Sequence, residues 1–143
     1  MTVRRAYFEN VRSLIEIHAV DFIAEESSDS IETYAQKIAN IKNIPWRNVD
    51  LTRKEREGVP DVNPLGIGTQ QDLDLQIFRE WVWVIRTAKA MKQSALLVCG
   101  LAHLTGLGEK FLSLGFEVET HVYFDRTDLE NLENRLESPG TQS

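Results

Sequence analysis

The stretch Ala95-Leu96-Leu97-Val98-Cys99-Gly100-Leu101-Ala102-His103 decides how this chain folds and where a site would lie. Its first five residues are apolar, which is typical of a strand buried on both faces of a parallel sheet. Gly100 then allows a tight turn, because glycine has no Cβ atom. The turn delivers His103 to the start of the next helix. We therefore expect a buried strand over 95–99 and a candidate functional histidine directly after it.

Helices and strands alternate along the rest of the chain. Apolar residues at helical spacing predict helices over 3–18, 31–42, 72–93 and 103–114. Short apolar runs predict further strands over 20–24, 46–51 and 116–124. This alternation predicts a single α/β domain over 1–137, with a small, mainly parallel sheet and helices on both faces. Residues 138–143 are expected to be a flexible C-terminal tail.

Several residues have the spacing of helix caps. N-terminal caps are expected from three pairs, in which an acceptor precedes a glutamate by three residues: Asp29 with Glu32, Thr52 with Glu55, and Thr127 with Glu130. Gly115 stands where a C-terminal cap belongs. The segment from Glu57 to Gln71 is rich in Gly and Pro and is expected to be a long loop.

Composition narrows the class of protein. The chain has 143 residues, 42% of them hydrophobic, which suits a globular domain with a real core. Its formal net charge is −6 and its Lys and Arg residues are scattered, so we expect no nucleic-acid partner. No apolar run approaches the roughly 20 residues that span a bilayer, and no secretory signal is visible, so we expect no membrane association. A single cysteine, Cys99, suits a reducing compartment, and we expect a cytoplasmic protein.

Polar side chains follow each of the first three strands along the chain. They are two glutamates after the first strand, an aspartate after the second and a histidine one turn after the third, namely Glu25, Glu26, Asp50 and His103. In a parallel sheet the carboxyl ends of the strands meet at one edge, and ligands bind there. We therefore expect these side chains to lie on the same edge.

Two carboxylates and a histidine at one edge suggest two kinds of chemistry. His103 with Glu25 would hold a divalent metal, or His103 would share acid and base roles with Glu25 and Glu26. Glu25 and Glu26 point to opposite faces if the strand continues, so one of them would face the cleft. The alternative is structural: His103 caps its helix or bonds to a nearby backbone group, and the acids are solvated charges that pair with Arg53 or Arg56.

Three further residues are candidate ligand-binding groups. Asp50 is either an auxiliary site residue or a turn residue. Arg79 and Arg86 flank an aromatic patch on the expected long helix, where they would bind an anionic group or pair with the acids of the sheet edge. His18, His121 and Cys99 are interpreted as structural.

Short motifs in the chain resemble those of a known protein group. Cys99-Gly100-Leu101-Ala102-His103 resembles the second G-x-x-H motif of the TraB/PrgY/GumN-like proteins and their ChaN-like and erythromycin-esterase-like relatives. Phe22-Ile23-Ala24-Glu25-Glu26 is similar to the strand that carries that group's acidic residue. The stretches Trp46–Arg56 and Arg79-Glu80-Trp81 look like those of small uncharacterised bacterial members. The resemblance implies a metal-dependent hydrolase or protease, or a haem-binding protein.

The chain departs from that group's pattern near its start. The group's proteins begin with a strand that is followed by a G-x-x-H motif of its own. This sequence begins with the helix at Val3, and no glycine lies three residues before His18. The resemblance therefore implies half a site, in a truncated, inactive or re-purposed member, or a site that a second subunit completes. The missing strand would also leave an open sheet edge through which two copies could pair.

The sequence supports one leading hypothesis and two alternatives. The leading hypothesis is a hydrolase-like protein of unknown substrate, with an incomplete acid–histidine site. That site would work either through a bound metal or through acid and base roles of its side chains. The first alternative is a non-catalytic module that binds a small molecule or a protein partner. The second is a structural accessory protein with a decayed site. The enzyme hypothesis requires the acids and His103 to converge within a few ångströms.

Overall fold

The computed structural model describes residues 3–27, 31–57, 70–122, 133–134 and 136. Within these residues the sheet has three parallel strands in the order β2-β1-β3, where β1 is Phe22–Glu25, β2 is Trp46–Asn48 and β3 is Ala95–Val98. The central strand β1 is buried along its whole length. This sheet confirms the small parallel α/β domain that the sequence predicts.

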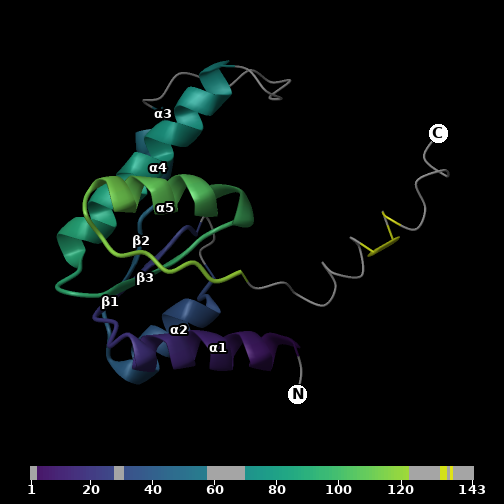
Figure 1. Cartoon of the computed structure of the whole chain (residues 1–143), viewed down its shortest axis with the longest axis vertical. Helices are drawn as coiled ribbons and strands as arrows, with labels where there is room; N and C mark the ends of the chain where they lie inside the picture. The colour runs from purple at the N-terminus through teal and green to yellow at the C-terminus, as the bar shows by residue number, and fades with distance from the viewer. Residues whose placement is uncertain (1–2, 28–30, 58–69, 123–132, 135, 137–143) are drawn as a thin grey trace.

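The helices form a layer on each face of the sheet (Figure 1). On one face lie α1 (Val3–Ile17) and α2 (Tyr34–Lys42). On the other face lie α4 (Gln70–Ala90) and α5 (Leu104–Ser113). The short α3 (Arg53–Glu57) follows β2, and a 3-10 turn, η1 (Leu101–His103), joins β3 to α5.

Alternating side chains of β1 form two separate cores. Ile23 is fully buried and packs with residues of α1 and α2, including Ile15 and Ile38. Phe22 and Ala24 point to the opposite face and belong to the core that α4 and α5 cover. Because β1 is covered on both faces, it has no polar alternation, which is why it reads as a continuous apolar run.

Two of the expected caps are present and one is wrong. Thr52 and Glu55 form a reciprocal capping box, with bonds of 2.8 Å from Thr52 N to Glu55 Oε1 and 3.1 Å from Glu55 N to Thr52 Oγ1. Gly115 has φ +90° and ends α5. The cap of α2 is Thr33 and not Asp29: Thr33 Oγ1 accepts a hydrogen bond from Gln36 N, so the helix begins later than the spacing of acids indicates.

The strand expected over 116–124 is a further correction. Residues 116–122 have no regular secondary structure and no strand pairing, and residues 123–124 lie outside the described part of the chain. A cavity separates this segment from β3, so its backbone does not reach the ladder groups of β3. The expected cap pair Thr127 and Glu130, the tail at 138–143 and most of the loop from Glu57 to Gln71 also lie outside the described residues.

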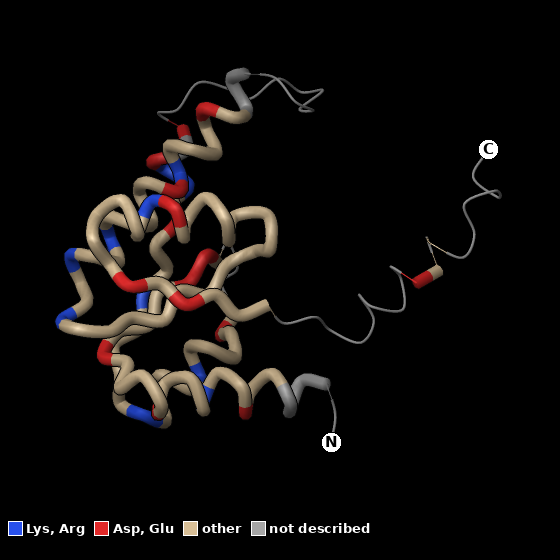
Figure 2. The backbone as a smooth tube through the Cα atoms, viewed as in Figure 1, with Lys and Arg blue, Asp and Glu red and all other residues tan. Residues whose placement is uncertain are grey.

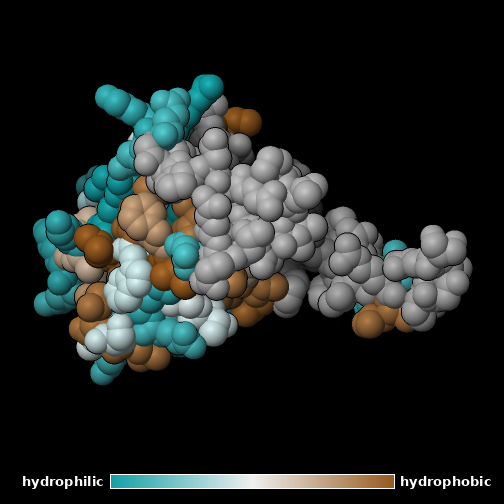
Figure 3. All heavy atoms as spheres, turned by 90° about the horizontal axis from the view of Figure 1, so that it is seen from above, coloured by the Kyte–Doolittle hydropathy of each residue, from teal (hydrophilic) through white to brown (hydrophobic). Residues whose placement is uncertain are grey.

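Helix α4 is only partly covered by the rest of the fold. Trp83 and Val84 are fully buried, whereas Leu73, Ile77 and Phe78 are about half exposed. Figure 3 shows one face of the molecule, where apolar and polar side chains are mixed. Within the described residues, no helix combines the length and the apolar character that crossing a bilayer requires.

Candidate functional site

The carboxyl ends of the three strands bring most of the predicted site residues together. Glu26 directly follows β1, Asp50 lies just beyond β2, and His103 ends the turn after β3. Arg79, from α4, reaches over this edge and links the first two carboxylates. The expected convergence therefore holds for Glu26, Asp50 and His103, with Arg79 at its centre.

Asp50 and Arg79 form the most tightly held pair of the edge. Arg79 donates to Asp50 through Nε (3.3 Å) and Nη2 (2.9 Å), and Nη2 also lies 3.3 Å from Glu26 Oε2. Trp83 Nε1 and Leu51 N each donate to Asp50 Oδ1 at 2.8 Å. Burial alone would raise the pKa of Asp50, but the bonds from Arg79, Trp83 and Leu51 outweigh it and hold that pKa below its ordinary value.

Glu80 and His103 form a second polar pair beside the first. Glu80 Oε2 lies 2.8 Å from His103 Nδ1, and Glu80 Oε1 accepts a bond of 2.9 Å from Lys110 Nζ on α5. Only 3% of the Glu80 side chain is exposed. Burial alone would raise the pKa of Glu80. Hydrogen bonds from Lys110, His103 and Gln76 outweigh burial, so the pKa of Glu80 lies below its ordinary value. Glu80 is therefore ionised at neutral pH.

An ionised Glu80 determines which ring nitrogen of neutral His103 carries the proton. A carboxylate only accepts hydrogen bonds, so Nδ1 must carry the imidazole proton. Nε2 then has a free lone pair, and it lies 3.8 Å from Glu26 Oε2, beyond hydrogen-bond distance. The ring is held from another side by the Trp83 indole, edge-on, with centroids 4.6 Å apart. The arrangement presents one basic nitrogen next to a carboxylate, in a side chain that is 13% exposed.

Glu80 owes its position to a glycine on α5. A Cβ atom on Gly106 would lie 2.3 Å from Glu80 Oε1, much closer than atoms can approach. Gly106 therefore leaves the space that the carboxylate occupies. Lys110, one helical turn later, closes the same space from the other side.

Glu25 is held apart from the His103 group. Its Oε1 accepts hydrogen bonds from Thr33 Oγ1 and Trp46 Nε1, on the side of the sheet where α2 lies. Burial raises the pKa of Glu25, and these two bonds only partly oppose that rise. Glu25 and Glu26 thus face opposite sides, and Glu26 is the one that faces His103.

Arg86 and Cys99 take structural places. Arg86 donates to the backbone oxygens of Val49 and Asp50 and pairs with Glu55, so it fixes the end of β2. Burial, with the charges of Glu26 and Glu80, raises the pKa of the Cys99 thiol to about 12. Cys99 is accordingly an inert thiol at neutral pH.

The two predicted metal ligands, Glu25 and His103, make separate contacts at this edge. Glu25 Oε1 is occupied by Thr33 and Trp46, whereas His103 contacts Glu80 and Glu26. The carboxylates beside His103 are paired with cationic side chains, whose charge opposes a bound cation. The metal site of His103 and Glu25 therefore stays a prediction from sequence, and the chemistry below uses the protein's own groups.

Sequence reasoning missed Glu80, Lys110 and Gly106. Glu80 lies in the middle of a long helix, away from the strand ends where ligand sites are sought. One signal was present: Gln76, Glu80 and Trp83 lie at helical spacing, which sets polar residues on the same side of α4 as a buried tryptophan. Figure 2 shows that the basic residues outside this group are spread over several elements.

Comparisons with protein-family models, with curated proteins and with solved structures find no match for this chain. The resemblance to the TraB/PrgY/GumN-like group therefore stays a prediction that rests on its short motifs.

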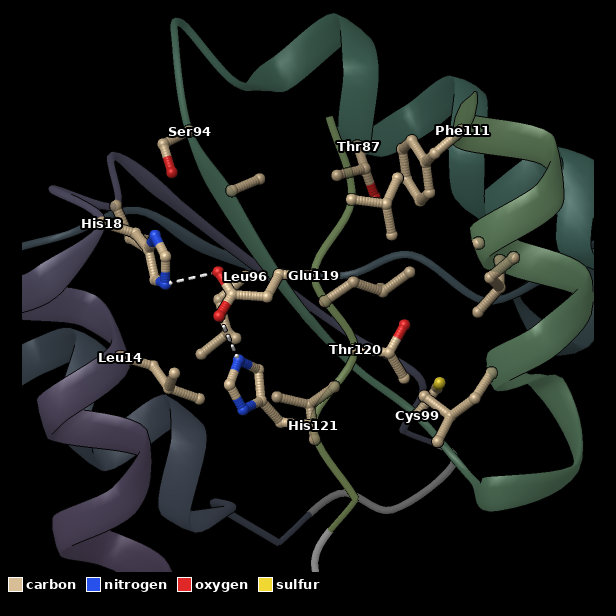
Figure 4. A pocket seen from close by; sticks show the side chains of 18 of the residues that line it. Leu14, His18, Thr87, Ser94, Leu96, Cys99, Phe111, Glu119, Thr120 and His121 are labelled. Atoms are coloured by element: carbon tan, nitrogen blue, oxygen red, sulfur yellow. Dashed lines mark ion pairs between the residues drawn. The ribbon is translucent and has the colours of Figure 1, made fainter. Parts of the chain in front are cut away.

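A cavity of about 860 Å³ lies away from this edge, between β3 and residues 116–122 (Figure 4). Leu96 and Phe111 are among its apolar lining residues, and His18, Glu119 and His121 also line it. The buried hydroxyl of Thr87, another lining residue, has no hydrogen-bond partner among the described residues. The molecule thus has a polar group at the sheet edge and a separate cavity that both apolar and polar side chains line.

Proposed function

We propose that the carboxyl edge of the sheet is an acid–base site that hydrolyses an ester-type bond, with His103 as the general base. The observation that carries this proposal is the 2.8 Å contact between Nδ1 of His103 and the buried carboxylate of Glu80. A histidine whose Nδ1 is held by a carboxylate keeps Nε2 oriented and ready to accept a proton. Glu80 is a positioning residue in this scheme.

The hydrolytic step uses four neighbouring side chains. A water molecule donates one proton to His103 Nε2 as its oxygen attacks the substrate carbonyl, and His103 returns the proton to the leaving group. The positive charge that His103 gains in between lies beside Glu80 and Glu26. Arg79, 22% exposed, is the cation beside Glu26 that would attract an anionic substrate group.

Hydrolysis of p-nitrophenyl acetate in the presence of EDTA tests this proposal. His103→Asn is the chosen variant, because the asparagine amide can still donate to Glu80 while the basic Nε2 is gone. We expect kcat/KM to fall by about 10²-fold or more. Glu109→Gln changes an exposed glutamate on α5 and should leave the rate unchanged.

Glu80→Gln tests the positioning role with a second readout. It removes the negative charge beside the imidazolium that forms only during the reaction, so kcat should fall while KM changes little. A purely structural role for Glu80 would lower the free energy of unfolding without this selective loss of kcat. Equal rates for the wild-type protein and His103→Asn would overturn the general-base proposal.

The cavity favours a second candidate function, the binding of a small apolar ligand without catalysis. Its volume of about 860 Å³ falls within the range of small-molecule sites, about 300–1,000 Å³.

Fluorescence of the dye ANS tests the second candidate. Val118→Trp would fill part of the cavity, and we expect it to weaken dye binding by about tenfold. Leu112→Trp is the matched control, since Leu112 is 59% exposed and lies outside the cavity lining. Equal dye affinity in the two variants would count against a ligand site in this cavity.

A further inference from the structure

Two histidines and a glutamate meet at the cavity, whose lining does not include His103 (Figure 4). His18 Nε2 lies 3.0 Å from Glu119 Oε2, and His121 Nε2 lies 3.2 Å from Glu119 Oε1. The ligand atoms of the three side chains all lie within 4.8 Å of one another. Among the described residues this is the one such group of three His, Cys, Asp or Glu side chains.

The local backbone explains why the three side chains meet. His18 is the first residue after α1, and Ala19 turns the chain with a φ of +48°. Glu119 and His121 are two residues apart in the segment that follows α5, and their side chains leave it on the same side, opposite to Thr120 (Figure 4). Figure 4 shows both reaching toward His18, which comes from the other end of the molecule's sequence.

The spacing of these atoms suits a small, tightly coordinating cation. A tetrahedral zinc ion binds imidazole nitrogen at about 2.0–2.1 Å and carboxylate oxygen at about 2.0–2.2 Å, which puts neighbouring ligand atoms about 3.3 Å apart. The contacts of 3.0 and 3.2 Å in this group are close to that separation, although they reach different oxygens of Glu119, and the three ligand atoms all lie within 4.8 Å of one another. A shift of the Glu119 carboxylate would let one of its oxygens share a metal ion with both imidazole nitrogens.

We propose that His18, Glu119 and His121 bind Zn²⁺. Two imidazoles and one carboxylate are a ligand set typical of zinc, and they leave one coordination position for water or another ligand. The side chains are 38%, 61% and 41% exposed, so an ion reaches them from solvent. The formal net charge of −6 adds a general attraction for cations.

A bound ion would connect two parts of the fold that lack a strong link. Residues 116–122 have no ladder bonds to β3, and the ion pairs of Glu119 with His18 and His121 are exposed. Exposed pairs of this kind contribute little to stability. Coordination would fasten the segment to the end of α1 across the cavity, so zinc should stabilise the folded state.

Zinc titration of the tag-free, full-length protein by calorimetry tests the site. We expect one Zn²⁺ per chain, a rise in melting temperature, and weaker binding at acidic pH, where protons compete for the imidazoles. His18→Ala, His121→Ala and Glu119→Gln should each weaken binding by about tenfold or more. All three side chains are at the surface, so loss of folding does not complicate the result.

Two control variants separate this site from other ligands in the chain. His103→Asn removes the third histidine and Cys99→Ser removes the thiol that lines the same cavity, and both should bind zinc as the wild-type protein does. Co²⁺ in place of zinc should give tetrahedral visible absorption that disappears in His18→Ala. Unchanged zinc affinity in both His18→Ala and His121→Ala, or no binding by the wild-type protein, would overturn the proposal. The hydrolysis assay contains EDTA, so its outcome is independent of this one.

Discussion

The Glu80 carboxylate occupies space that Gly106 leaves free, because glycine has no Cβ atom. Gly106→Ala would place a Cβ atom 2.3 Å from Glu80 Oε1 and push the carboxylate away from Lys110 and His103. Because Glu80 is buried, losing these partners should cost about 1–3 kcal/mol, more than the helix propensity that alanine adds. Urea unfolding of Gly106→Ala measures this loss.

Gly108→Ala is the matched control on the same helix. A Cβ atom there meets only Val118 Cγ1, at 3.9 Å, which is ordinary contact. Alanine should therefore stabilise the protein by about 0.5–1 kcal/mol through helix propensity alone. Equal effects of the two substitutions would show that the position of Glu80 does not depend on Gly106.

The pKa of Glu25 is shifted upward, whereas the pKa values of Asp50 and Glu80 are shifted downward, so Glu25 should change stability with pH in the opposite direction. Its pKa is raised by burial, so the folded protein binds this proton more tightly than the unfolded chain does. The stability that this proton contributes is full at acidic pH and is lost as the pH rises through the raised pKa. Glu25→Gln stays neutral and can still accept from Thr33 and Trp46. We expect it to be more stable than the wild-type protein at pH 7, with the difference shrinking toward pH 4, as measured by urea unfolding at both pH values.

At the scale of the elements, the end of α1 carries a residue that fits its backbone poorly. Ala19 has a φ of +48°, in the left-handed region that favours glycine. Ala19→Gly should relieve this strain and stabilise the protein by about 0.5 kcal/mol, after the greater freedom of glycine in the unfolded chain is counted. Ala88→Gly, inside α4, should instead destabilise by about 1 kcal/mol. Thermal melting of both variants checks the two signs.

The elements that sequence predicts well are those with a strong apolar period. The stripe of α1 and the continuous apolar runs of β1 and β3 indicate helix and strand directly, because burial of one or both faces leaves a visible pattern. The expected strand over 116–124 has a strand-like composition as well. Whether such a segment pairs depends on its distance from β3, and a cavity intervenes, which no local pattern reveals.

For the whole molecule, we expect the folded state to lose stability at acidic pH. The pKa values of Asp50 and Glu80 are lowered, so their contribution to stability is present above the ordinary carboxyl range and is lost as the pH falls below about 4. Asp50→Asn with Glu80→Gln removes this linkage. A double variant whose stability falls with acid as steeply as that of the wild-type protein would contradict this assignment.

The candidate site was predictable only in part, for a reason of topology. Residues directly after strands must gather at the carboxyl edge of a parallel sheet, so Glu26, Asp50 and His103 could be found from order alone. Glu80 and Lys110 come from the middle of two helices whose relative placement depends on packing. The meeting of His18 with Glu119 and His121 likewise depends on the path of the chain after α5.

The most direct test of the central claim is the protonation state of His103, from a long-range ¹H–¹⁵N NMR spectrum of histidine-labelled protein. Comparison with His103→Asn assigns the signals of this ring. If the ionised Glu80 orients His103, the neutral ring carries its proton on Nδ1 and Nε2 is bare. Glu80→Gln should weaken that preference. A neutral His103 with its proton on Nε2 would contradict the account, because the nitrogen that faces Glu26 could then accept no proton.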